Sequence, residues 1–114
     1  MTRRTFLATV AATPAFAARI QGLKIGVTDW NLRQRGTPAA VELARRLGFD
    51  GVEVSLGRTP EGGKLPLDNS ALQEQYLAEA KKHGIHLAGT CLDILHVNYL
   101  KNDRLGQKWI ADGI

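Results

Sequence analysis

Three short apolar runs, separated by segments that carry the hydrophobic period of a helix, constrain the fold more than any other feature of the sequence. The runs are LKIGVTDW at 23–30, GVEVSL at 51–56 and IHLAGTCL at 85–92. Runs of this length, bounded by glycine and polar residues, predict strands. The segments between them are long enough for a helix and leave no room for a hairpin, so the strands should be parallel. The chain is therefore expected to have an α/β fold.

Local signals predict where the helices begin and end. Thr37-Pro38 offers an N-cap followed by a proline at the first helical position, and Gly48 stands where that helix should stop. Residues 70–73 read Ser-Ala-Leu-Gln, which fits a capping box, and Gly84 follows a basic stretch at the expected end of the second helix. A third helix is expected over 105–114.

Alternation of strand and helix at this spacing is typical of a TIM barrel or of an open doubly wound sheet. No GxGxxG or Walker pattern follows the first run, which disfavours a nucleotide-binding open sheet. We therefore expect a partial (β/α)8 TIM barrel made of the first three βα units. Three strands cannot close a barrel of eight, so residues 18–114 are interpreted as an incomplete N-terminal part of such a domain.

The first 17 residues have the layout of a signal peptide. Paired arginines, Arg3 and Arg4, precede a modestly apolar stretch, and small residues satisfy the A-x-A pattern for a cut between Ala17 and Ala18. The TRRTFL segment resembles the twin-arginine consensus and departs from it only at Ala8, where the consensus has lysine. We expect export to the periplasm by the twin-arginine pathway. The alternative is an amphipathic N-terminal helix that stays attached.

Charge and cysteine content exclude several classes of partner. Without Arg3 and Arg4 the 15 basic residues fall to 13 against 11 acidic ones, which is too even a balance for a nucleic-acid surface. No apolar run approaches the ~20 residues that span a bilayer, so no membrane partner is expected once the leader is removed. Cys91 is the only cysteine, and it is interpreted as a small buried apolar residue.

Chemistry in parallel α/β folds lies at the carboxyl ends of the strands, and this position selects the candidate residues. Asp29 and Trp30 close the first run, where they could orient a polyol; the alternative is a strand-end cap beside a packed indole. Glu53 is a carboxylate inside an apolar strand, which suits either a pocket or a structural ion pair. His96 leaves the third strand, where a histidine can bind a metal or a hydroxyl.

Three segments, LKIGVTDWNL, LARRLGFDGVEVSLG and EAKKHGIHLAGTCLDILHVNYL, together resemble the opening of the xylose-isomerase-like TIM-barrel superfamily, particularly its sugar phosphate isomerase/epimerase members. The resemblance implies a metal-dependent sugar or polyol isomerase or epimerase that moves a proton through a cis-enediolate. It implies a divalent metal, Mn, Mg, Co or Zn, in the full-length protein. The catalytic glutamates of the family come from later strands, so no catalytic residue is expected in this chain.

The resemblance carries over to a few positions only. Trp30 and Glu53 match pocket-lining positions, and His96 matches the histidine after the third strand. In the endonuclease branch of the superfamily a similar H-x-x-Y-L segment contributes a zinc ligand, which makes His96 a candidate metal ligand and a zinc phosphodiesterase an alternative function. The other alternative is a non-catalytic half-barrel that binds a partner or forms a homo-oligomer.

Overall fold

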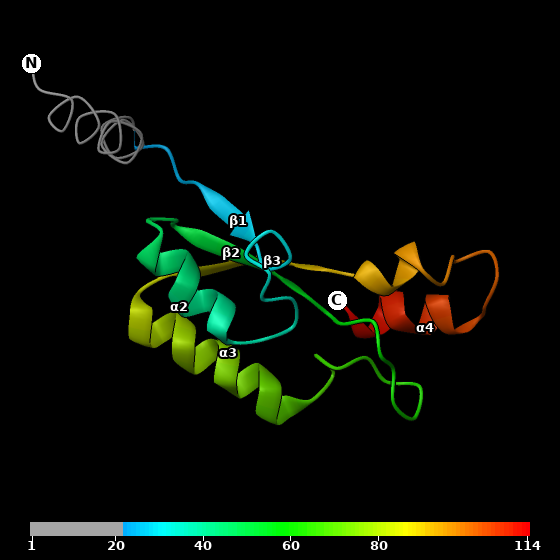
Figure 1. Ribbon diagram of the computed structural model, residues 1–114. Helices are drawn as coiled ribbons and strands as arrows, with labels where there is room; N and C mark the ends of the chain where they lie inside the picture. The colour runs from blue at the N-terminus through cyan, green and yellow to red at the C-terminus, as the bar shows by residue number, and fades with distance from the viewer. Residues whose placement is uncertain (1–21) are drawn as a thin grey trace, which may run out of the picture.

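Three parallel strands form one sheet in the computed structural model, which describes residues 22–114 (Figure 1). The strands are β1 (Gly26–Thr28), β2 (Gly51–Ser55) and β3 (His86–Cys91), and they lie side by side in chain order. Both strand pairs are parallel, so the α/β class and the parallel pairing predicted from the apolar runs are confirmed. The expected signal peptide and its cleavage site lie outside the described residues.

Helices connect the strands and follow the last one. They are α2 (Ala39–Arg46), α3 (Ser70–His83) and α4 (Leu105–Asp112), and a 3-10 turn, η1 (Asp93–His96), directly follows β3. Figure 1 shows α2 and α3 next to each other on one side of the sheet, whereas α4 lies beyond the carboxyl ends of the strands and runs back toward them. Between residues 22 and 114 no helix has the length and apolar character needed to cross a membrane.

The expected capping signals were wrong by a residue or two at both helix starts. Asn69, not Ser70, caps α3, because its Oδ1 accepts the Leu72 N–H at 3.2 Å. α2 begins at Ala39 without a side-chain cap, because the Thr37 hydroxyl donates to Gln34 instead. The end of α3 was predicted correctly: Gly84 adopts the left-handed conformation that terminates the helix.

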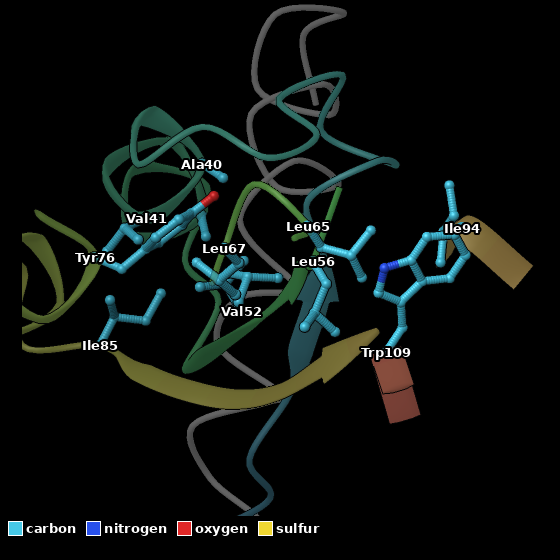
Figure 2. Packing of buried hydrophobic residues seen from close by; sticks show 12 residues of the cluster. Ala40, Val41, Val52, Leu56, Leu65, Leu67, Tyr76, Ile85, Ile94 and Trp109 are labelled. Atoms are coloured by element: carbon cyan, nitrogen blue, oxygen red, sulfur yellow. The ribbon is translucent and has the colours of Figure 1, made fainter. Parts of the chain in front are cut away.

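The core lies between the sheet and the two helices that cover it. Val52 and Val54 of β2 point toward the helices, where they meet small and branched residues of α2 and the ring of Tyr76 from α3 (Figure 2). The alternation of the strand therefore turns Glu53 and Ser55 to the opposite face. The helical layer determines which face of the sheet remains available for binding.

A second part of the core joins α4 to the loop between β2 and α3. The Trp109 indole packs near Leu65, Leu56 and Ile94 (Figure 2), and its Nε1 donates to the Gly63 carbonyl at 3.0 Å. These contacts fix the loop and η1 next to the carboxyl end of the sheet. Segments that follow different strands are thus held together at one edge.

One irregularity in the pairing changes the direction of β3. Val52 pairs with Leu87 but Glu53 pairs with Gly89, so Ala88 is an extra residue in β3. Past this bulge Thr90 faces the same side as Val54, and Cys91 pairs with Ser55. The end of β3 is thereby set in phase with the end of β2.

Small residues line the face of the sheet that the helices leave open. A Cβ added at Gly51 would lie 3.3 Å from Ala88 Cβ, and one at Gly26 would lie 3.5 Å from the Gly51 carbonyl oxygen. The three strands therefore approach each other closely there and present a shallow surface. Glu53 and Thr28 are the polar side chains that extend above this surface, at paired positions of β2 and β1.

Candidate functional site

Asp29, which directly follows β1, is fully buried and joins three segments of the chain. Its Oδ1 accepts the Ser55 hydroxyl at 2.7 Å, and its Oδ2 accepts the N–H groups of Ser55 and Gly36, each at 2.9 Å. A buried carboxylate needs such donors, and here all of them come from the protein. Asp29 thus ties the end of β2 and the β1–α2 loop to the end of β1, the arrangement of a strand-end cap.

Asp93 makes an equivalent set of contacts after β3. Its side chain is almost fully buried, Oδ1 accepts the Gly57 N–H at 3.1 Å, and Oδ2 accepts Arg58 Nε at 3.1 Å. Arg35 Nε lies 3.8 Å from the same Oδ2. The carboxyl ends of all three strands are therefore linked through two buried carboxylates. We call Asp29, Ser55, Arg58, Asp93 and Arg35 the carboxyl-edge cluster.

Glu53 and Thr28 line a hollow of about 370 Å³ on the open face of the sheet. Val27, Asn31 and two small residues, Gly26 and Ala88, complete it. The Thr28 hydroxyl is buried and has no hydrogen-bond partner among residues 22–114. The ion pairs within the same residues do not include Glu53. The hollow thus presents a carboxylate and a hydroxyl whose hydrogen-bonding capacity the protein has not used.

Cys91 lies between the hollow and the carboxyl-edge cluster. Burial raises the pKa of its thiol, and the carboxylates of Asp93, Glu53 and Asp29 raise it further, whereas Arg35 lowers it. All four charged groups are therefore close enough to act on one side chain. The two sets of residues form a single polar region at the carboxyl end of the sheet, and in it the thiol is held in its neutral form.

Trp30 and His96 have no role in this polar region that the contacts reveal. Trp30 is half-buried in the turn after β1, where its carbonyl accepts the Arg33 N–H at 3.1 Å. His96 ends η1 and is exposed. In the part of the chain that the structure describes, no three His, Cys, Asp or Glu side chains converge to hold a metal ion. The residues described here do not make up a metal site, and no step below depends on a metal.

Ser55, Thr28, Asp93 and the two arginines were missed in the sequence, although some signals pointed to them. Ser55 follows Glu53 by two positions in the same strand and so shares its face, and Asp93 follows β3 as Asp29 follows β1. The rule that selects residues at strand ends would have found both. Arg35 and Arg58 carried no such signal, because both lie in irregular loops.

Comparisons with protein-family models, with curated proteins and with solved structures find no match to this chain.

Proposed function

We propose that residues 22–114 form the first three βα units of a (β/α)8 barrel of the sugar isomerase/epimerase type and bind the hydroxyl groups of a sugar or polyol substrate. The observation that carries this proposal is the hollow on the open face of the sheet. In it the Glu53 carboxylate and the unsatisfied Thr28 hydroxyl occupy directly paired positions of two parallel strands.

The chemistry of the two groups suits a polyol. A carboxylate accepts hydrogen bonds from neighbouring hydroxyls, and a threonine hydroxyl both donates and accepts. A buried polar atom without a partner costs stability, so the Thr28 hydroxyl gains when a ligand supplies the missing hydrogen bond. The small residues below the two side chains leave room for a flat ring or an extended polyol chain close to the backbone.

The position of the hollow also supports the barrel. In (β/α)8 enzymes the helices cover the outside, and substrates bind at the carboxyl end of the strands. Here α2 and α3 cover one face, while the polar groups lie on the other face and at the carboxyl edge. We assign to this chain the binding and orientation of substrate. Proton transfer and the divalent metal are assigned to glutamates and ligands of the later units of the barrel.

Binding can be tested on the full chain by titration with D-fructose or glycerol, followed by ¹H–¹⁵N correlation spectra. We expect shifts at the amides of Thr28, Asn31, Glu53 and Ala88. Glu53→Gln and Thr28→Val should each weaken binding about fivefold, the effect of one hydrogen bond of about 1 kcal/mol. Shifts that spread over the whole surface, or none at these amides, would refute the proposal.

A matched control uses Glu74, an exposed glutamate on α3. Glu74→Gln removes the same charge far from the hollow and should leave the affinity for fructose unchanged. Equal losses in Glu53→Gln and Glu74→Gln would mean that net charge, rather than the hollow, determines binding.

We also propose that the first 17 residues direct export to the periplasm. Fused to a folded reporter, they should deliver it to the periplasm of a bacterium with a functional twin-arginine translocase. Replacing Arg3 and Arg4 together by lysine should abolish delivery while keeping the charge. Export that persists in the double variant would argue against this pathway.

A further inference from the structure

Two arginines approach one buried carboxylate at the carboxyl edge, which is one cation more than the carboxylate requires. Asp93 already accepts the Gly57 N–H and forms a hydrogen-bonded ion pair with Arg58 at 3.1 Å. Arg35 Nε lies 3.8 Å away, which is too far for a hydrogen bond. Arg35 is therefore a neighbour of this ion pair without being its partner, and its positive charge is in surplus there.

Both guanidinium groups keep donors available for a ligand. Their closest contacts to Asp93 use Nε, so the two Nη groups of each arginine are free of that interaction. The side chains are 39% and 32% exposed, whereas Asp93 is 3% exposed. The buried carboxylate thus anchors two cationic forks that reach solvent side by side, a geometry suited to an oxyanion group.

The backbone on which each arginine stands is also fixed. Arg35 precedes Gly36, whose N–H donates to Asp29, and Arg58 follows Gly57, whose N–H donates to Asp93. Both glycines have positive φ angles, +67° and +97°. The two loops are therefore held by buried hydrogen bonds next to the arginines, which lowers the entropy lost when a ligand binds.

We propose that Arg35 and Arg58 bind an anionic group, a phosphate monoester or a carboxylate, carried by the sugar whose hydroxyls lie against Glu53 and Thr28. This inference rests on the proposed function and specifies its substrate class. The hydroxyl end of the ligand meets the acidic part of the polar region and the anionic end meets the basic part. Glu53 then disfavours binding in the reverse orientation through charge repulsion.

The test compares D-fructose, fructose 6-phosphate, glucuronate and inorganic phosphate on the full chain at low ionic strength, by the same amide titration. We expect at least one of the two anionic sugars to bind about tenfold more tightly than fructose, and the difference between them shows whether phosphate or carboxylate is preferred. Arg35→Gln should remove most of this gain and leave the affinity for fructose unchanged. It leaves Asp93 its contacts with Arg58 and Gly57, so the fold should be retained.

Two further variants make the result specific. Arg58→Lys keeps the charge but loses the fork, and should weaken binding of the anionic sugar with little change for fructose. Arg46→Gln, on an exposed arginine in the last turn of α2, should change neither affinity.

The outcomes separate the two proposals. Fructose bound at the hollow, with no gain from an anionic group, would overturn this inference and leave the proposed function intact. Inorganic phosphate bound as tightly as the anionic sugar would also overturn it, because the arginines would then form a site for free phosphate. A loss in Arg46→Gln equal to that in Arg35→Gln would reduce the effect to net charge. Failure of every sugar to bind would refute both proposals.

Discussion

Removing the hydroxyl of Tyr76 should stabilise the protein. The side chain is 2% exposed and its Oη has no hydrogen-bond partner among residues 22–114, although the ring packs in the core between the sheet and α3 (Figure 2). Burying an unsatisfied hydroxyl costs about 1–3 kcal/mol, whereas Tyr76→Phe keeps the ring and its contacts. After allowance for the small void that remains, we expect a gain of about 1 kcal/mol in the free energy of unfolding.

The pH dependence gives this prediction a second, independent part. Burial, assisted by the charge of Asp29, raises the pKa of Tyr76 from 10.0 to about 12. Because the folded state then holds the phenol proton more tightly than the unfolded state, stability is unaffected below about pH 10 and falls as the pH rises toward 12. At about pH 11 the wild type should lose about 1 kcal/mol that Tyr76→Phe does not lose.

Urea unfolding followed by circular dichroism, at neutral pH and near pH 11, measures both effects. For a domain of this size a gain of 1 kcal/mol corresponds to a rise of about 4–8 °C in Tm. Tyr99→Phe, which removes a hydroxyl from an exposed ring, should leave stability unchanged. If Tyr76→Phe is destabilising by about 1 kcal/mol or more, the hydroxyl has a partner and the reasoning is wrong.

Three other predictions concern the carboxyl edge. Asp29→Asn presents an amide to donors that now bind a carboxylate, and should reduce the free energy of unfolding by about 2–4 kcal/mol in urea; a loss below about 1 kcal/mol would contradict the role of Asp29 as a cap. Gly57→Ala should cost more than about 2 kcal/mol, because its Cβ would lie 2.5 Å from Pro66 Cγ, whereas Gly62→Ala, which also has a positive φ but meets nothing within 4 Å, should cost about 1 kcal/mol by thermal unfolding. The raised pKa of Cys91 lowers its thiolate fraction, so a disulfide reagent near pH 8 should modify the native thiol about tenfold more slowly than the urea-unfolded one, and equal rates would be the contrary result.

The sheet could be predicted because its determinants are local. Each strand is a short apolar run, and the segments between the runs can only be helical crossovers, so parallel pairing follows from chain length alone. The end of α3 was equally local, since Gly84 directly follows the basic last turn. The start of α3 was missed by one residue because Asn69 and Ser70 are both good caps. Only the tertiary position of the loop decides between such neighbours.

The site could be predicted only where strand ends mark it. Asp29 and Glu53 were found by their position, but the hydrogen bonds between Asp29 and Ser55 join residues 26 apart. Their meeting depends on the register of β1 against β2, which no local pattern encodes. Arg35 and Arg58 were missed for the same reason, since they approach each other only through Asp93.

The bulge at Ala88 makes the parity of β3 part of the design of the polar region. In a strand each added or removed residue exchanges the two faces for everything downstream, so the chain after Ala88 can be shifted only in steps of two. Without the extra residue Cys91 would exchange faces with Thr90, and Asp93 would leave the strand half a step out of phase with Arg58. An insertion or deletion would be absorbed more readily in the exposed turn at Gly62 than in β3, where one residue decides which side chains share a compartment.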